Sequence, residues 1–361
     1  MGKQLRIWLF VLLSTLLAST TLLAQGIITM TTSKAVGEKI KLRVEANGNV
    51  TIEGAQETGE TDDLDRKSYR LTSQTITIRG DVTELDCSFN QLTSLDVSKN
   101  TALINLDCSK NKLTSLDVSK STALTTLDCS FNQLTSLDVS KNTALTELDC
   151  SCNRLTSLDV SKNTALTELA CSSNQLTSLD LSKNAALTEL DCSYNKLTSL
   201  DVSKNSALTR LNCSVNELAS LKLSKSTALT TLDCSFNQLT SLDVSKNTAL
   251  TVLGCNGNQL TSLDVSKNTA LTELDCNGNK LTNLNISGCA RLEMLFCASN
   301  YIKGKAMTKL VNSLPNRRGM SRGTLFIVNP SSKKRDKNRY SAADITTAKR
   351  KNWEVGQLRA F

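Results

Sequence analysis

The chain has 361 residues, of which 39% are apolar and 4% aromatic, with a net charge of +8, thirteen cysteines, two prolines and no histidine. The missing histidine excludes Ser-His-Asp and Cys-His catalysis and removes the commonest zinc ligand. The charge is uneven, because residues 301–361 carry fifteen Lys and Arg against three acidic residues, which leaves the first 300 residues with a net charge of −4. The chain therefore combines an acidic body with a basic tail.

Residues 1–24 have the pattern of an export signal peptide. Lys3 and Arg6 precede a largely apolar run over residues 7–18, and Ala24 supplies a small residue at a cleavage position. The run is shorter than the ~20 residues of a transmembrane helix. We therefore expect an exported protein without a membrane span in the mature chain, either secreted or associated with the cell surface or outer membrane. An uncleaved anchor is the alternative.

Residues 25–81 alternate apolar and polar side chains as β-strands do. Ile40, Leu42 and Val44 form one such series, and Thr75–Ile78 continue the pattern. A repeat array follows this segment, and the exposed end of a stacked sheet needs a cover. The segment is therefore predicted to be an N-terminal β cap.

Residues 82–302 repeat with a period of 21. One unit, Leu103-Ile-Asn-Leu106-Asp-Cys108-Ser-Lys-Asn111-Lys-Leu113, is the leucine-rich repeat pattern LxxLxCxxNxL. The repeating cysteines are Cys87, Cys108, Cys129, Cys150, Cys171, Cys192, Cys213, Cys234, Cys255, Cys276 and Cys297. Each is followed three residues later by an asparagine, beginning with Asn90, Asn111, Asn132 and Asn153 and ending with Asn300. Eleven leucine-rich repeats are predicted.

Alternation along the short strand places Leu106 and Cys108 inward and Asn105, Asp107 and Ser109 outward. Stacked copies form a parallel sheet with rungs ~4.8 Å apart. The second half of each unit repeats the motif with Val in place of Cys, which predicts a further extended segment rather than a helix. The predicted fold is a leucine-rich repeat solenoid, a shallow horseshoe that is mainly parallel β, with short extended segments on both faces.

The repeats resemble those of the internalin family of bacterial leucine-rich repeat proteins, and most closely the internalin J subgroup. In that subgroup Cys replaces one strand leucine and forms a cysteine ladder, and the motifs match over residues 82–300. The resemblance implies a secreted or surface-exposed binding protein that recognises a protein or glycan on a host or neighbouring cell, with roles in adhesion, biofilm formation and virulence.

The cysteines have three possible roles. Export favours disulfides, but equivalent inward positions give neighbouring rungs parallel Cβ directions, which suits a disulfide poorly. A metal site would need close Cys pairs, and only Cys150 and Cys152 come close, without any histidine. We therefore interpret the ladder cysteines as small buried hydrophobic residues with free thiols, and expect Cys152 nearer the surface and Cys289 at the second-half Asn position.

The outward positions of the first half vary between rungs, while the second half repeats Ser-Leu-Asp-Val-Ser-Lys with few changes. An acidic face edged by aromatic side chains is a candidate surface for a protein or glycan. The alternative is that the aromatic side chains pack locally over their turns. Calcium could also bind weakly to the acidic columns, although no calcium-loop motif is present. The candidate ligand-binding residues are Phe89, Phe131, Tyr194, Phe236, Glu147, Glu168, Glu189, Asp107, Asp128 and Asp149.

Residues 303–361 are predicted to form an α/β C-terminal cap with a basic loop. Ser341 with Asp344 three residues later indicates a capping box at the start of a helix. The expected elements are a helix over 303–314, a strand over 324–329, the basic loop over 331–339, a helix over 342–351 and a last strand at 353–355.

The predicted function is non-enzymatic adhesion by a monomer that uses no cofactor, no metal and no catalytic residue. The tail contains no GxSxG motif and no paired catalytic carboxylates. The alternative is that the basic segment 301–361 binds an acidic glycan or nucleic acid, and this binding would weaken steeply with salt. Nucleic acid is not the expected partner.

Overall fold

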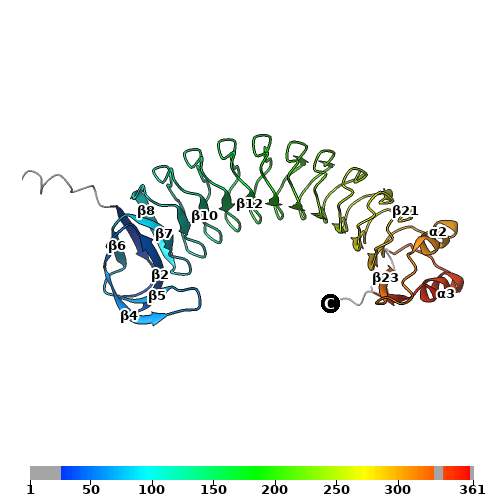
Figure 1. The fold of residues 1–361 in the computed structure, drawn as a ribbon, viewed down its shortest axis with the longest axis horizontal. Coiled ribbons are helices and arrows are strands. Elements are labelled where there is room, and N and C mark those ends of the chain that lie inside the picture. Colours follow the sequence, from blue (N-terminus) through cyan, green and yellow to red (C-terminus); the bar gives the residue numbers. More distant parts are fainter. Residues whose placement is uncertain (1–25, 329–335, 358–361) are drawn as a thin grey trace, which may run out of the picture.

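The computed structural model describes residues 26–328 and 336–357. The predicted export signal over residues 1–24 and residues 331–335 of the predicted basic loop lie outside the described residues. The described chain is a curved solenoid, with the N-terminal strands at one end of the arc and two helices at the other (Figure 1).

The inner, concave side of the arc is lined by a parallel sheet built from the first half of each repeat (Figure 1). The strands pair in strict register, so that Leu127 lies opposite both Leu106 and Leu148. The predicted leucine-rich repeat solenoid is therefore confirmed. The repeat strands of this sheet are β7 (Val82–Asp86), β9 (Asn105–Asp107), β10 (Thr126–Asp128), β11 (Glu147–Asp149), β12 (Glu168–Ala170), β13 (Glu189–Asp191), β15 (Arg210–Asn212), β17 (Thr231–Asp233), β18 (Val252–Gly254), β20 (Glu273–Asp275) and β22 (Met294–Phe296).

The second halves of the repeats run along the convex side as extended segments and turns. Within the described residues, regular strands form there at five places only. The outer side of an arc is longer than the inner side, so neighbouring rungs stand farther apart there and pair less regularly. These strands are β8 (Leu92–Lys99), the parallel pair β14 (Ser199–Asp201) and β16 (Ser220–Lys222), and the parallel pair β19 (Ser262–Asp264) and β21 (Asn283–Asn285).

A continuous apolar core runs through the coil between these two sides. In one repeat, Leu103, Leu106 and Cys108 are buried, and the same positions are buried in the neighbouring repeats. One predicted orientation is wrong, because Ser109 is buried rather than outward. The backbone turns after Cys108, and the N–H of Ser109 donates to Oδ1 of Asp107 at 2.9 Å, which ends the strand's alternation one residue early.

The N-terminal strands join both sides of the coil. They extend the concave sheet through the antiparallel pairing of β2 with β7, and they cover the start of the convex side through the pairing of β1 with β8. The β pattern predicted over this segment includes β1 and β4, although no separate series was singled out at either strand. That this segment is a separate cap stays a prediction. Its strands are β1 (Ile27–Thr32), β2 (Lys39–Ala46), β3 (Thr51–Glu53), β4 (Ala55–Thr61), β5 (Lys67–Leu71) and β6 (Thr75–Arg79).

At the C-terminal end, two more parallel strands follow β22 in the concave sheet. The rings of Phe296 and Phe326 stack with centroids 5.1 Å apart across this junction. The capping box of Ser341 and Asp344 is present at the second helix, as predicted. The elements are α2 (Lys305–Ser313), β23 (Gly323–Val328), α3 (Ala342–Arg350) and β24 (Trp353–Gln357). Neither helix in the described part of the chain has the length and apolar character needed to span a membrane.

Candidate binding surface

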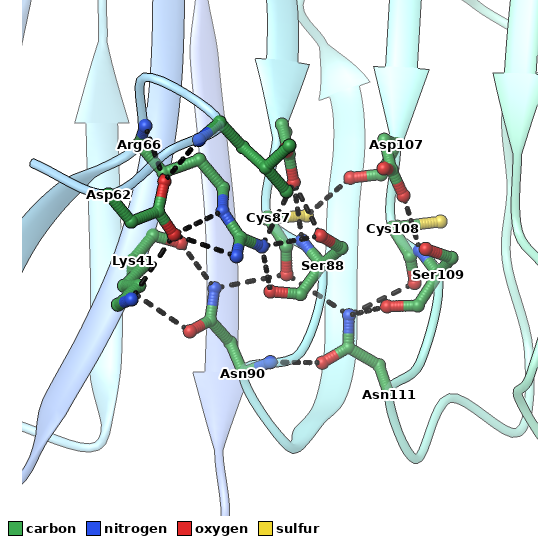
Figure 2. Close-up of polar contacts among 12 residues, drawn as sticks. Lys41, Asp62, Arg66, Cys87, Ser88, Asn90, Asp107, Cys108, Ser109 and Asn111 are labelled. Atoms are coloured by element: carbon green, nitrogen blue, oxygen red, sulfur yellow. Dashed lines mark hydrogen bonds and ion pairs between the residues drawn. The ribbon is translucent and has the colours of Figure 1, made fainter.

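Each concave strand ends in a turn that a buried asparagine side chain closes. Nδ2 of Asn111 donates to the carbonyl oxygens of Cys87 and Cys108 at 3.1 and 3.0 Å (Figure 2). Its Oδ1 accepts the N–H of Leu92 at 2.9 Å. One amide therefore satisfies backbone groups of two successive rungs. Asn132 and Asn153 repeat this arrangement.

Asn90 plays the same part at the first rung, but its partner is an N-terminal strand. It exchanges two hydrogen bonds with the backbone of Lys41: Nδ2 donates to the carbonyl at 2.6 Å and Oδ1 accepts the N–H at 2.9 Å. The asparagine column therefore ties the repeat array to β2.

The asparagines of the second half are bonded less completely. Nδ2 of Asn142 donates to the carbonyl oxygens of Val118 and Ser121 at 2.9 and 2.8 Å. Its Oδ1 is buried and has no hydrogen-bond partner among the described residues. The same holds for Asn163, Asn184, Asn205, Asn247 and Asn268. This column also changes residue type, to Ser121, Ser226 and Cys289, whereas the first-half column is Asn at every rung.

The ladder cysteines are fully buried and free. The Sγ of Cys87 lies 3.4 Å from the carbonyl oxygen of Asp107 in the next rung and donates to it. Burial raises the pKa of the ladder thiols, to about 12 for Cys297. Thiolate is the reactive form, so these residues act as core side chains. Cys289 is buried at the second-half Asn position, and Cys152 is half-buried on the turn.

The predicted acidic residues lie side by side on the concave sheet. Glu168 is paired in register with Glu147 on one side and Glu189 on the other. Glu147 and Glu168 are exposed, and Nε of Arg210 on the following rung lies 3.6 Å from a carboxylate oxygen of Glu189. These side chains line a shallow groove of about 640 Å³ that extends from β10 to β17.

The aspartates Asp107, Asp128 and Asp149 form a second column. They lie two residues after the glutamate positions and are therefore closer to the turns. Each accepts the N–H of the serine two residues later at 2.8 to 2.9 Å. Burial raises the pKa of Asp107 and Asp128. These carboxylates therefore have a structural task at the strand ends, and their half-buried positions leave the glutamates as the more accessible charges.

The aromatic residues lie in a third column, on the turns themselves. Phe89, Phe131, Tyr194 and Phe236 have 53%, 52%, 59% and 59% of their surface exposed. The ring of Phe236 also lies against the next turn, at Gly257, so local packing and an exposed ring face occur together there. The four aromatic positions are two or three rungs apart, so the structure does not gather them into one cluster. The residue before each first-half asparagine occupies this position. At every rung its backbone is left-handed, with φ between 52° and 66°.

A basic and aromatic corner at the first rung was not predicted from the sequence. Arg66 donates from Nη2 to Asp62 at 2.9 Å and from Nη1 to the hydroxyl of Ser88 at 2.8 Å (Figure 2). The guanidinium of Arg66 holds the pKa of Asp62 well below its usual range. Arg66 also lies 5.7 Å from the ring centroid of Phe89. Asp62 and Arg66 come from the loop between β4 and β5, and Ser88 and Phe89 come from the first repeat. Nothing in their sequence spacing indicates that they meet.

No cluster of three or more metal-ligating Cys, Asp or Glu side chains is found in residues 26–328 and 336–357. The prediction of a protein without metal, cofactor or catalytic residues stays a prediction.

Comparison with known proteins identifies the repeat type. A family model for leucine-rich repeats in two copies matches residues 122–163. The comparison with curated proteins gives no match.

Solved structures supply closer relatives. The functional domain of InlJ from Listeria monocytogenes, which includes a cysteine ladder, is 32% identical, with a TM-score of 0.52; the match covers 80% of this chain and 76% of that one. The internalin InlF from the same species is 18% identical, with a TM-score of 0.59 over 77% of this chain and 87% of that one. It shows the shared fold alone.

The ectodomain of the plant receptor kinase GASSHO1/SCHENGEN3 from Arabidopsis thaliana also has this fold. It is 22% identical, with a TM-score of 0.55 over 72% of this chain and 36% of that one, and was solved in complex with CASPARIAN STRIP INTEGRITY FACTOR 2.

Proposed function

Because this chain belongs to the internalin family of bacterial leucine-rich repeat proteins, we propose that it is an exported, non-enzymatic adhesin that binds a protein on its concave face. The family gives the class of function. The partner belongs to a host or a neighbouring bacterial surface, and the protein is itself secreted or held at the cell surface. The export signal predicted over residues 1–24 supports this location.

The observation that carries the proposal is that the exposed residues of the concave sheet vary from rung to rung while its buried leucines repeat. The leucines of neighbouring concave strands pair in identical register from rung to rung. The outward residue beside them is Glu in three successive rungs, at Glu147, Glu168 and Glu189. It then changes to Arg210, Thr231 and Val252 in the next three. A frame that repeats while its exposed side chains differ presents a distinctive pattern, and a folded partner can recognise that pattern.

The exposed charges of the concave face indicate what kind of surface the partner has. Glu147 and Glu168 are exposed neighbours on adjacent strands, ~4.8 Å apart along the sheet, so their like charges repel in the free protein. A partner that places Lys or Arg over this part of the groove relieves the repulsion. We therefore propose a partner with a basic patch.

Site-specific crosslinking tests the proposal. A photoreactive residue in place of Glu168, on the concave face, is compared with one in place of Lys162, an exposed residue in the second half of a repeat. Both proteins are incubated with host and bacterial surface extracts. Crosslinking of a defined protein from position 168 and not from position 162 supports the concave face. Equal or exclusive crosslinking from position 162 contradicts it.

The alternative is binding of acidic glycan or nucleic acid by the basic segment 301–361. Some of its cations have structural tasks: Arg317 is buried and donates to the carbonyl of Leu292 at 3.1 Å, and Lys351 donates to the carbonyl of Leu314 at 2.7 Å. Fewer free cations remain than the charge of the segment suggests. Replacing Lys305 and Lys309 on α2 with neutral residues in the full chain distinguishes the two proposals. Binding through the basic segment should weaken, whereas binding at the concave face should be unchanged.

A further inference from the structure

Two columns of side chains flank the buried asparagines where the concave strands end. We call them together the turn edge. The residue before each asparagine forms the first column: Phe89, Lys110, Phe131, Cys152, Ser173, Tyr194, Val215, Phe236, Gly257, Gly278 and Ser299. The residue after each asparagine forms the second: Gln91, Lys112, Gln133, Arg154, Gln175, Lys196, Glu217, Gln238, Gln259, Lys280 and Tyr301. Two residues of chain span at most about 7 Å, so the columns run side by side.

The first column holds aromatic rings where the backbone favours glycine. A left-handed φ is costly for a side chain with a Cβ, and two rungs place Gly there without that cost. Four rungs instead hold Phe or Tyr, each with more than half of its surface exposed, and the other five hold smaller or polar residues at the same φ. A large ring that stays exposed on this costly backbone indicates a task outside the fold.

The rings lie along the direction in which the rungs stack. A Cβ added at Gly257 would meet the ring of Phe236 from the rung before it, so this ring rests on the next turn. The ammonium of Lys110 lies 4.2 Å from the ring centroid of Phe89 and 5.6 Å from that of Phe131. The exposed rings therefore form a series along the solenoid, two or three rungs apart.

The second column is a series of amides and cations that bond to one another. Nζ of Lys112 donates to Oε1 of Gln91 at 2.9 Å, and Nζ of Lys280 donates to Oε1 of Gln259 at 3.0 Å. Nη2 of Arg154 donates to Oε1 of Gln133 at 3.1 Å. The column contains five Gln and four cations against one acid, Glu217. It is therefore a positive strip beside the acidic concave face.

We propose that the turn edge binds an extended, carboxylate-bearing glycan that runs parallel to the solenoid axis. The flat faces of the rings stack on the C–H faces of the sugars, the glutamine amides bond to hydroxyl groups, and the Lys and Arg pair with carboxylates. This site is separate from the concave face, so it stands or falls independently of the proposed protein partner.

Spacing agrees with a linear sugar chain. Successive rings are two, three and two rungs apart, which is ~10, ~14 and ~10 Å at ~4.8 Å per rung. A β-1,4-linked pyranose chain advances by about one rung spacing per sugar, so the rings can fall under every second or third sugar.

Other ligand classes fit the turn edge less well. A peptide strand needs a free sheet edge, but the concave-sheet strands that lie between β7 and β22 in the strand order are hydrogen-bonded on both sides. Single-stranded nucleic acid binds by stacking successive bases on aromatic side chains. The rings of the turn edge stand two or three rungs apart, which is wider than the step between successive bases.

The test measures binding of the full mature protein to β-1,4-linked oligomannuronate, to neutral oligomannan of equal length and to oligo-dT by calorimetry at two salt concentrations. The ring variant is Phe89→Gly, Phe131→Gly, Tyr194→Gly and Phe236→Gly, which suits the backbone. The cation variant is Lys112→Gln, Arg154→Gln, Lys196→Gln and Lys280→Gln. Matched controls are Tyr340→Ala, another exposed aromatic, and Lys141→Gln with Lys162→Gln, which neutralise exposed cations in the second halves of the repeats.

The proposal predicts that the protein binds oligomannuronate and that salt weakens this binding. The ring variant loses at least about tenfold in affinity, since one stacking contact is worth roughly that factor. The cation variant loses the preference for oligomannuronate over oligomannan, and both controls bind as the parent does. Unchanged binding by the ring variant, or tighter binding of oligo-dT than of oligomannuronate, would overturn the proposal.

Discussion

The side-chain amide oxygen of Asn132 accepts the backbone N–H of Leu113, one rung earlier, at 2.9 Å. Nδ2 of the same residue donates to the carbonyl oxygens of Cys108 and Cys129 at 3.0 and 3.1 Å. Nearly all the bonding capacity of one buried amide is therefore used to hold two rungs together. On the convex side, Oδ1 of Asn142 and of five other asparagines has no hydrogen-bond partner among the described residues.

This difference predicts unequal costs for two similar substitutions. Asn132→Ala strands a buried N–H and several carbonyl oxygens, so we expect it to lower the free energy of unfolding by about 3 kcal/mol or more. Asn142→Ala strands fewer groups, and we expect about 1–2 kcal/mol. Urea unfolding followed by circular dichroism measures both. Asn142→Ser is the control, because Ser121 already occupies an equivalent position. Equal costs for the two alanine variants would refute this account.

The thiols are predicted to divide into one reactive residue and twelve protected ones. Cys150 is fully buried and Cys152, two residues later, is half-buried at the turn. Burial raises the pKa of the Cys150 thiol far above its usual range, so little thiolate forms near pH 8. Native protein treated with a thiol reagent should label Cys152 rapidly and the ladder cysteines only after unfolding. Rapid labelling of several ladder cysteines in native protein would sink the core assignment.

The left-handed column predicts a stabilising substitution. Val215 has φ of 54°, and a β-branched side chain is poorly suited to that backbone, whereas Asn tolerates it. We expect Val215→Asn to raise the free energy of unfolding by about 1 kcal/mol. Phe131→Gly, at the same position of another rung, should leave stability nearly unchanged. A clear loss of stability in Phe131→Gly would show that the ring serves the fold rather than a ligand.

Stability should depend on pH through Asp275. Burial raises the pKa of its carboxyl to about 6, against about 4 in an unfolded chain. The folded form therefore binds this proton more tightly, so the contribution to stability is complete below about pH 4 and is lost as the pH rises through about 6. Denaturation between pH 4.5 and pH 7 should show a decline to which Asp275 contributes up to about 2 kcal/mol.

Asp275→Asn should flatten this decline and stabilise the protein at pH 7. The amide can still accept the N–H of Asn277, as the carboxylate does at 2.9 Å. Asn212 already performs this task in another rung by accepting the N–H of Ser214. Asp138→Asn is the contrasting variant, because hydrogen bonds from Ser140 lower the pKa of Asp138 and its contribution is lost only at lower pH. A pH profile unchanged by Asp275→Asn would contradict the assignment.

The sequence predicts the fold well because the same local pattern of Leu, Cys and Asn occurs in all eleven repeats. The Leu and Cys positions fix the inward faces, and Asn111 with its equivalents fixes the turns. Ser109 departs from this pattern, because the backbone turns after Cys108 and places Ser109 in the core instead of on the outside. The bounds of β1 and β4 escaped prediction because nothing repeats in the N-terminal segment to reinforce a weak pattern.

The candidate site was only partly predictable. The column of Glu147, Glu168 and Glu189 follows directly from the period of 21. The left-handed backbone under Phe131 does not follow, since it depends on the turn geometry that the asparagine imposes. The contact of Arg66 with Phe89 joins segments of unrelated spacing and appears only once the chain is folded.

The most direct test of the concave face uses charge reversal against the partner captured by crosslinking. Glu147→Lys with Glu168→Lys is compared with Lys141→Glu and Lys162→Glu, which reverse exposed charges in the second halves of the repeats. We expect affinity for the partner to fall about tenfold or more in the first variant, mainly at low salt, and to stay at the parent value in the second. Equal affinity of the first variant and the parent protein would contradict binding at the concave face.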